Sequence, residues 1–360
     1  MGIKICIIGC GNISNTRHIP ALKKNPKAEI VGLISAEIDK IQRTIKKHRF
    51  PEIIDSFVLD PERDPYEQLC NVKWFLDNID AVIIGTPPQT HYDLAIACLK
   101  LKKHVLLEKP MMMNSGQCDE AIELARESGV VLGIMHSFQF SNGMITLSEK
   151  VNKGELGSIK SILEVQLTNR KRRLPLWYDE LPLGLFYDES AHFFYCANRF
   201  GDGDLRVSNA NAVFNKDENT PLFLQAQVFA GSVPVQMYMN FNSPICEWFY
   251  ILIGDEKIAL YDYFKDILVV LDNDGEHLSK NVLKTSLSFV AQFWKGFIIN
   301  GIKMLSGKLL YGQDVCVDKY LEAINNGKDI CFELSPLLGK QVVKAMNEVI
   351  AYAKNGNKLD

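Results

Sequence analysis

The distribution of apolar and polar residues divides the chain into two parts with different periodicity. In the first part, continuous apolar runs such as residues 3–8 and 81–84 are typical of strands buried on both faces. Apolar residues recur at helical spacing between these runs, as in residues 117–128. Further strands are expected at residues 29–35, 105–107 and 130–135, and further helices at residues 39–49 and 91–102. This alternation through residues 1–135 predicts an α/β domain with a doubly wound parallel sheet of the Rossmann type.

Beyond residue 135, apolar positions alternate with polar ones, as expected for strands with one buried face. In residues 234–241, for example, Val235, Met237 and Met239 alternate with polar residues. Other strands are expected at residues 158–168, 222–229, 249–253, 258–262 and 267–271, with hairpin turns at 231–232 and 254–255. The pattern predicts an α+β domain over residues 136–360 that is built on a large, mostly antiparallel open sheet.

Two segments near the C-terminus are expected to be helices. Residues 337–354 have apolar side chains at helical spacing, and this terminal helix is expected to pack back toward the first domain. Residues 289–310 are rich in Phe, Trp, Ile and Leu but are interrupted by Lys295, Lys303 and Lys308. We expect this segment to pack on a core or a subunit, and membrane contact is the less favoured alternative. No apolar run reaches the roughly 18 residues that a membrane-spanning helix needs.

Composition and charge argue against several classes of protein. The 360 residues exceed what one compact core usually holds, so two domains are expected. A net charge of -3 gives no electrostatic basis for binding nucleic acid or an acidic membrane. The nine cysteines are scattered and odd in number, which is typical of reduced thiols in a cytoplasmic protein. They show no zinc-ligand spacing, so no metal site is expected.

A glycine-containing loop follows the first strand directly. Gly9 allows a tight turn there, and Gly11 lets the backbone approach a pyrophosphate at the N-terminus of the next helix. Ser14 takes the third glycine position of the usual dinucleotide fingerprint. We therefore expect NAD or NADP to bind to Gly9, Gly11, Asn12 and Ile13.

The end of the second strand leaves the choice between NAD and NADP open. Ser35 stands where an acidic residue would bind the adenosine ribose of NAD, and serine there is more usual with NADP. Ala36 follows, however, where an arginine would be needed for a 2′-phosphate. Glu37 would repel that phosphate if it pointed inward, but it could equally begin the next helix as a solvated acid.

Glu108-Lys109-Pro110 ends an apolar strand with an acid, a base and a rigid proline. Ligands bind at the carboxyl ends of parallel strands, and a partly desolvated lysine there can exchange protons. Asp188 and His192 are four residues apart, so on a helix they share a face and could join Lys109 in one cleft. The alternatives are an ordinary surface Glu–Lys pair and a satisfied helix cap.

Several segments, in order, resemble the Gfo/Idh/MocA oxidoreductase family over essentially the whole chain. They are the Gly9/Gly11 loop, residues 80–91, residues 104–110, residues 154–157, and Gly184 followed by residues 188–192. Two departures are visible. Ser190 replaces the usual glycine of the Asp-x-Gly-x-His segment, and Gln139 stands where many members have an arginine, so we infer no substrate contact at position 139.

The resemblance implies hydride transfer between the nicotinamide and a carbinol carbon, usually of a sugar or cyclitol. It implies that His192 is the acid/base, that Lys109 hydrogen-bonds the reacting oxygen and that Asp188 positions the hydroxyl or the histidine. Residues implied to lie along the cofactor are Thr86, Pro87, His91, Glu108 and Lys109, with Ser35 at the ribose.

The substrate is indicated only by a basic run, residues 170–173, which precedes Trp177. If this run faces the cleft, Arg170 and Arg172 suit a phosphate or nucleotide on a sugar, and Trp177 could stack on a ring. A solvated basic loop with a packed tryptophan is the alternative.

The sequence thus predicts an NAD(P)-dependent oxidoreductase that acts on a CH–OH group of a sugar or a phosphorylated or nucleotide-linked sugar. Two other functions stay open: a non-catalytic ligand-binding or regulatory protein on this fold, and a reductase of a dihydrodiol or tetrapyrrole. A binding protein has no need of Lys109, Asp188 and His192 together, which argues against the first. A homodimer or homotetramer through the open sheet face is expected, because that face needs cover.

Overall fold

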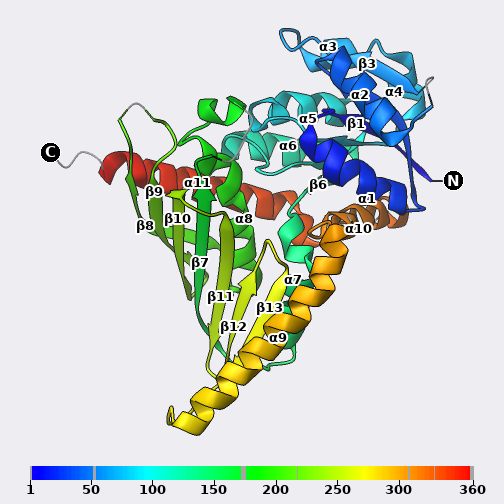
Figure 1. Cartoon of the computed structure of the whole chain (residues 1–360). Helices are drawn as coiled ribbons and strands as arrows, with labels where there is room; N and C mark the ends of the chain where they lie inside the picture. Colours follow the sequence, from blue (N-terminus) through cyan, green and yellow to red (C-terminus); the bar gives the residue numbers. More distant parts are fainter. Residues whose placement is uncertain are drawn as a thin grey trace. The chain divides into compact units, whose positions relative to one another are not determined.

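Figure 1 shows the computed structural model, which describes residues 2–51, 54–171, 176–216, 218–306, 309–327 and 329–356. The chain forms two compact units. The first contains Met1–Ser137 together with Gly312–Lys344, and the second contains Phe138–Tyr311 together with Ala345–Asp360. The first unit therefore combines the N-terminal part of the chain with a segment from near the C-terminus.

The first unit is organised around a parallel sheet of six strands in the order β3-β2-β1-β4-β5-β6. The side chains of the apolar strands β4 and β5 are almost all buried, and β1 lies between β2 and β4. The order reverses between β1 and β4, and such a switch point is where open α/β sheets bind ligands. The predicted doubly wound sheet is confirmed. The strands are β1 (Ile3–Ile8), β2 (Ala28–Ser35), β3 (Asp55–Val58), β4 (Ala81–Ile84), β5 (His104–Leu107) and β6 (Leu132–Ile134).

Helices complete the first unit. The sequence pattern missed β3 and three of the helices, α3, α4 and α10. Of these, β3, α3 and α4 are short and mix polar with apolar residues, so they show too little periodicity, whereas α10 was missed although it has 14 residues. The helices in chain order are η1 (Ser14–His18), α1 (Ile19–Lys24), α2 (Ile38–His48), α3 (Pro65–Leu69), α4 (Lys73–Asn78), η2 (Pro88–Thr90), α5 (His91–Lys100), α6 (Ser115–Ser128), α10 (Gln313–Asn326), η5 (Phe332–Leu334) and the first part of α11 (Pro336–Gly356).

The second unit contains a sheet of seven strands in the order β13-β12-β11-β7-β10-β9-β8. Only the pair β7–β10 is parallel, so the predicted mostly antiparallel sheet and both hairpins are confirmed. The sequence pattern missed β8, whose outward positions carry Asn and Ser rather than strand-forming residues. The strands are β7 (Ile159–Asn169), β8 (Leu205–Val213), β9 (Phe223–Ala230), β10 (Val233–Ser243), β11 (Glu247–Gly254), β12 (Lys257–Asp262) and β13 (Ile267–Asp272).

The two faces of this sheet differ in burial. On one face, Tyr250 pairs with Glu164 and with Tyr261, and all three side chains are buried. The helices α7 (Asn142–Asn152) and α8 (Leu185–Phe200) contact the sheet, α7 at β12 and β13 and α8 at β7, β9 and β10. On the other face, residues such as Leu163 and Ile251 stay partly exposed. The sheet is therefore open on one side.

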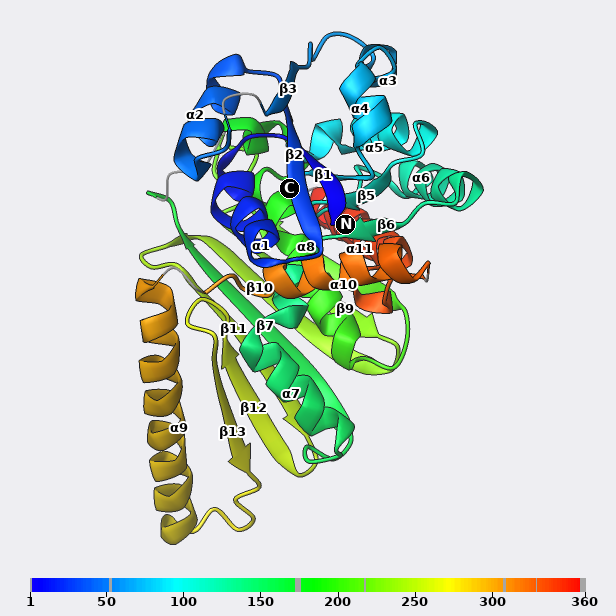
Figure 2. The same cartoon turned by 90° about the vertical axis from the view of Figure 1, so that its right-hand side faces the viewer.

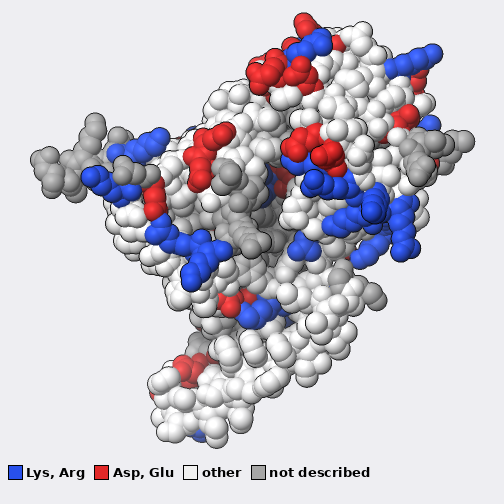
Figure 3. Space-filling model, turned by 45° about the horizontal axis from the view of Figure 1, so that its top comes forward, with Lys and Arg blue, Asp and Glu red and all other residues white. Residues whose placement is uncertain are grey.

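The long helix α9 (Ser279–Leu305) lies along the edge strand β13 (Figure 2). It begins ten residues before the predicted segment 289–310, because residues 279–288 are too polar for an apolar run to show them. On the face drawn in Figure 3, acidic and basic side chains occur near one another rather than as a field of one sign. That mixture agrees with the small net charge of the chain.

Candidate active site

The loop after β1 has the geometry of a dinucleotide-binding turn. Gly9 has φ +98, and a Cβ there would lie 2.6 Å from the Gly85 carbonyl oxygen, so only glycine fits. At Gly11, in contrast, a Cβ would meet no atom within 4 Å. Asn15 holds the loop from behind, because its Nδ2 donates to the carbonyl oxygens of Cys10 and Gly11 at 3.0 and 2.9 Å. The space at Gly11 is thus open to a ligand.

Ser14 and Gly85 together replace the third glycine of the fingerprint. The Ser14 hydroxyl donates to the Gly9 carbonyl oxygen at 2.5 Å and is fully buried. A Cβ on Gly85, at the end of β4, would come within 2.7 Å of the Ser14 hydroxyl and 3.0 Å of the His18 ring. The missing side chain at Gly85 therefore makes the room that a glycine at position 14 would otherwise provide.

His18 and Glu108 form a buried pair beneath this loop. Nε2 of His18 lies 2.7 Å from Oε1 of Glu108, and the two residues are 0% and 7% exposed. The second carboxylate oxygen of Glu108 accepts the backbone N–H of Lys109 at 3.1 Å. Glu108 thus connects the helix after β1 to the start of Lys109-Pro110, whose peptide bond is cis.

Replacing Glu108 by alanine is expected to lower the free energy of unfolding by about 3 kcal/mol, because His18 loses its partner in a buried site. Equilibrium denaturation of wild type and variant near neutral pH measures the loss. Glu123→Ala is the matched control, since Glu123 is an exposed acid on α6 whose ion pair with Arg126 contributes little. Equal losses for the two variants would contradict a structural role for the buried pair.

The pair also makes stability depend on pH. Burial raises the pKa of Glu108, but the hydrogen bond and charge of His18 and the charge of Lys109 outweigh burial and hold it below its usual value. A carboxyl with a lowered folded-state pKa stabilises the fold above its unfolded-state pKa, and this contribution is lost as pH falls through the folded-state pKa. The stability advantage of the wild type over Glu108→Gln should therefore shrink below about pH 4.

His91 links the loop after β4 to Pro110. It is fully buried, with Nδ1 2.9 Å from the Pro110 carbonyl oxygen and Nε2 3.0 Å from that of Thr86. Burial lowers the pKa of His91 and so favours the neutral ring, which can donate to only one of these oxygens. This position suits holding Thr86 and Pro87 against Pro110 better than touching a ligand directly.

The end of β2 stays compatible with both dinucleotides. Ser35 is 7% exposed and ends the strand beside the Gly9 loop, because the Gly9 N–H donates to the Ile34 carbonyl oxygen. Glu37 is exposed, and its carboxylate pairs with Lys40 at 2.5 Å in the first turn of α2. Glu37 thus lies as a solvated acid at the start of α2, which is one of the two interpretations that the sequence allowed.

In the second unit, Asp188 and His192 lie on one partly exposed face of α8. Most of this helix is buried, because its sequence is rich in aromatic and small residues. Asp188 and His192 are one turn apart and only partly buried, as expected for a shared face. Gly184 begins the helix with φ +56, where a Cβ would lie 2.1 Å from the Thr220 hydroxyl, so glycine is required.

Aromatic side chains fix the position of the His192 ring. It stacks on Phe138, with ring centroids 4.4 Å apart and an angle of 24° between planes. Trp248 lies edge-on to it, with centroids 5.1 Å apart. Nδ1 of His192 is hydrogen-bonded to the Tyr195 hydroxyl. The ring is therefore oriented before any substrate binds.

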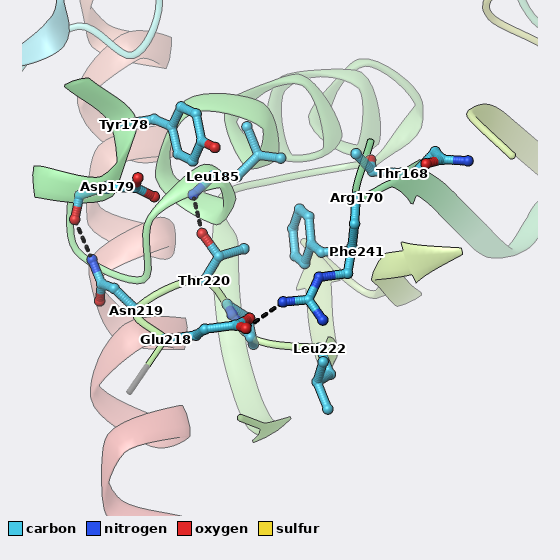
Figure 4. A pocket seen from close by; sticks show the side chains of 12 residues that line it. Thr168, Arg170, Tyr178, Asp179, Leu185, Glu218, Asn219, Thr220, Leu222 and Phe241 are labelled. Atoms are coloured by element: carbon cyan, nitrogen blue, oxygen red, sulfur yellow. Dashed lines mark hydrogen bonds and ion pairs between the residues drawn. The ribbon is translucent and has the colours of Figure 1, made fainter. Parts of the chain in front are cut away.

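A pocket of about 540 Å³ lies at the N-terminal end of α8 (Figure 4). Leu185, three residues before Asp188, lines it together with Arg170 from the end of β7. Arg170 points toward Glu218, with which it forms an ion pair. The other lining residues are Thr168, Asn169, Tyr178, Asp179, Asn219, Thr220, Pro221, Leu222 and Phe241.

The structure brings the predicted site residues together in two groups. In the first unit, Gly9, Gly11, Thr86 and Lys109 follow the carboxyl ends of β1, β4 and β5. The predicted residues Asn12 and Ile13 begin the helix after β1, and Pro87 and Glu108 follow β4 and β5. In the second unit, Asp188 and His192 share α8, and Trp177 lies in η4 (Leu176–Glu180), beside the pocket residue Tyr178. Arg172 lies outside the described residues.

Sequence reasoning missed the residues that support the predicted ones. His18 escaped notice because it contacts Glu108 from a π-helical turn, which no ordinary helical spacing reveals. Phe138, Tyr195 and Trp248 have no sequence feature that distinguishes them from the many other aromatic residues of the second unit. The spacing of three between His192 and Tyr195, which puts both on one side of a helix, is the one signal that could have drawn attention to Tyr195. Among the described residues, no cluster of His, Cys, Asp or Glu could hold a metal.

Comparisons with known proteins agree with this geometry. Residues 3–136 match the GFO_IDH_MocA family model, described as an oxidoreductase family with an NAD-binding Rossmann fold. The chain is similar to scyllo-inositol 2-dehydrogenase (NADP(+)) of Bacillus subtilis, with 23% identity over 242 residues, 64% of this chain and 63% of that protein. It is also similar to myo-inositol 2-dehydrogenase of Thermotoga maritima, with 28% identity over 193 residues, 53% of either chain. The chain thus spans less than two thirds of these relatives.

A solved structure with a similar fold is that of a 3-ketoreductase from Actinomadura kijaniata in complex with NADP and TDP-benzene. The TM-score is 0.74 at 17% identity, and the match covers 98% of each chain. At this identity the likeness concerns the fold, and it extends over both units.

Proposed function

This chain belongs to the Gfo/Idh/MocA oxidoreductase family, and from that premise we propose that it is an NAD- or NADP-dependent dehydrogenase or reductase of a sugar. The observation that carries the proposal is the oriented His192 ring, one turn from Asp188 on the partly exposed face of a buried helix. Relatives named for inositol dehydrogenation support a polyhydroxylated substrate. The proposed substrates include phosphorylated and nucleotide-linked sugars, because the structure of the 3-ketoreductase contains TDP-benzene.

The residues of the first unit suit a dinucleotide. Gly9 allows the tight turn, and Gly11 leaves room for the pyrophosphate at the start of the helix, where backbone N–H groups favour negative charge. Asn12 and Ile13 begin that helix, and Ser35 would contact the adenosine ribose. Thr86, Pro87 and Lys109 would line the nicotinamide end, with His91 and Glu108 holding them. The bound dinucleotide supplies the acceptor or donor of the hydride at its nicotinamide C4.

The residues of the second unit would handle the proton. As hydride leaves a carbinol carbon, the His192 imidazole would take the hydroxyl proton, and it would return that proton to the carbonyl oxygen in the reverse direction. The Tyr195 hydroxyl and the Phe138 ring hold the imidazole in place. Asp188 would orient the substrate hydroxyl, and the Lys109 ammonium would donate to the reacting oxygen.

Arg170→Ala tests whether the pocket receives a charged group of the substrate. Removal of the guanidinium should raise KM for a phosphorylated or nucleotide-linked sugar by about tenfold and change kcat little. Neutral sugars should be affected less, because they carry no anionic group for the guanidinium to pair with. Steady-state kinetics on both substrate classes measure the effect, with Arg206→Ala on β8 as an exposed-arginine control. Equal changes for the two classes would refute a phosphate role.

The proposed activity is tested with a panel of sugars, cyclitols and nucleotide sugars, each assayed with both dinucleotides. Turnover of at least one is expected. If only dihydrodiols or tetrapyrroles are turned over, the proposed sugar substrate is wrong and the protein is a reductase of those compounds. If a dinucleotide binds but no compound is turned over, a regulatory protein is favoured.

We also propose a cytoplasmic homodimer or homotetramer. All nine cysteines are free thiols, as a reducing compartment requires. The open face of the second sheet carries partly exposed apolar side chains on β7, β11 and β12, among them Val165, Ile251 and Leu260, which a second copy would cover. Sedimentation velocity should detect a dimer or tetramer, and a monomer at all concentrations would contradict this.

A further inference from the structure

The helix α9 turns its polar face toward the sheet and its apolar face toward solvent, the reverse of an ordinary surface helix. The side chains that face β13 are polar or small, and they lie at helical spacing: Asn281, Thr285, Ser288, Gln292, Gly296 and Asn300. The opposite side is apolar and exposed, with Leu283 at 61%, Leu287 at 62% and Trp294 at 55% exposure. Roughly half of the exposed large hydrophobic side chains among the described residues lie on this one helix. A helix that faced only water would carry the opposite arrangement.

Hydrogen bonds hold α9 in this orientation. The Gln292 side chain pairs with the backbone of the edge strand, donating to the Val270 carbonyl oxygen at 2.8 Å and accepting the Val270 N–H at 2.9 Å. The Asn300 amide donates to the Asp266 carbonyl oxygen. Gly296 lets the helix approach Ile267, since a Cβ there would lie 3.0 Å from that side chain. The polar face of α9 thus covers the free edge of β13. Because these contacts fix the polar face against the strand, the apolar face points away from the sheet.

The charges on α9 indicate what covers the apolar face. The helix carries Lys280, Lys284, Lys295 and Lys303 and not one Asp or Glu between residues 279 and 305. Among the described residues, only Lys284 of these four has an ion pair, at 3.8 Å from Asp272. The nearest acids in sequence, Asp272, Asp274 and Glu276, precede the helix. The helix therefore carries an excess of positive charge on a chain whose net charge is -3.

From these observations we propose that α9 docks the protein onto an anionic lipid surface. Aromatic and aliphatic side chains such as Leu287 and Trp294 would enter the boundary between headgroups and acyl chains, and the lysines would contact anionic headgroups. No helix in the described part of the chain has the length and apolarity to cross a membrane, so docking is in the plane of the surface. A second copy paired through α9 would set lysines against lysines without carboxylates on the helix to neutralise them. From the sequence, membrane contact was the less favoured alternative for this segment; the orientation and charge of α9 favour it.

Co-sedimentation of the full-length protein with vesicles tests the proposal. Vesicles with phosphatidylglycerol should bind the wild type, and phosphatidylcholine vesicles or high salt should weaken binding by about tenfold. The double variant Leu287→Glu, Trp294→Glu should lose at least about tenfold in partitioning. Leu337→Glu, which alters an equally exposed leucine on α11, should bind as the wild type does.

The experiment distinguishes a lipid surface from a second copy of the chain as the partner of α9. Failure of the wild type to bind either kind of vesicle would overturn the proposal. Concentration-dependent self-association that the double variant abolishes, without vesicle binding, would show that a second copy covers α9 and would also overturn it. Circular dichroism checks that the double variant is folded. If it is not, Lys280→Gln with Lys295→Gln, which leaves the apolar face unchanged, must still weaken binding to phosphatidylglycerol vesicles. Unchanged binding would contradict the proposed role of the lysines.

Discussion

Replacing Lys109 by alanine is expected to lower turnover by about 10²-fold or more and to leave the affinity for the dinucleotide nearly unchanged. The physical reason is that the ammonium group would stabilise the charge that develops on the reacting oxygen, which exists only in the transition state. The variant should fold normally, because Glu108 keeps its pair with His18 and its bond to the backbone N–H of residue 109. Steady-state kinetics with the substrate found in the panel, together with a dinucleotide titration, measure both quantities.

The matched control is Lys100→Ala, which removes an exposed lysine of the same unit from the end of α5. Its turnover should stay within a factor of about two of the wild type. Unchanged turnover in Lys109→Ala would remove Lys109 from the mechanism. A parallel loss of dinucleotide affinity would instead show that Lys109 acts mainly in binding.

Replacing Gly11 by valine is expected to weaken dinucleotide binding by about 10²-fold or more without a loss of thermal stability. A Cβ at Gly11 meets no protein atom within 4 Å, so the fold tolerates the side chain. The same side chain would occupy the space in which the backbone approaches the pyrophosphate. Titration with NADH and NADPH gives the affinity, and thermal denaturation gives the stability.

Variants of two other glycines serve as comparisons for Gly11→Val. Gly301→Val is the control, because a Cβ there also meets no atom within 4 Å but lies in the second unit. Gly9→Val should instead unfold at lower temperature, since its Cβ would lie 2.6 Å from the Gly85 carbonyl oxygen and its φ is +98. Dinucleotide affinity that survives in Gly11→Val would place the pyrophosphate elsewhere.

The sequence predicted the parts of the fold whose apolar pattern is visible in the residues themselves. The strands β1, β4 and β5 are apolar runs, and β10 has enough residues to show its alternation. In contrast, β3 begins with Asp55 and Ser56, and β8 carries asparagine at outward positions where strand formers are usual. Neighbouring strands determine these elements more than their own composition does.

The site could be predicted only where a residue type is itself the signal. Gly9 and Gly184 can be recognised from the sequence because a tight turn and a close approach of the backbone require glycine. Asp188 and His192 can be recognised because residues four apart share a helix face. His18 and Gly85 do not, since their roles arise from a contact between the helix after β1 and the end of β4. The outward apolar face of α9 was likewise hidden, because a sequence shows that a helix is amphipathic but not which face meets the sheet.

The central claim is that the first unit binds a nicotinamide dinucleotide for hydride transfer, and titration of the purified protein with NADH and with NADPH tests it most directly. Binding should occur with one site per chain for at least one of them, and it should be lost in Gly11→Val but kept in Gly301→Val. An absence of binding with both dinucleotides in the folded wild-type protein would contradict the claim.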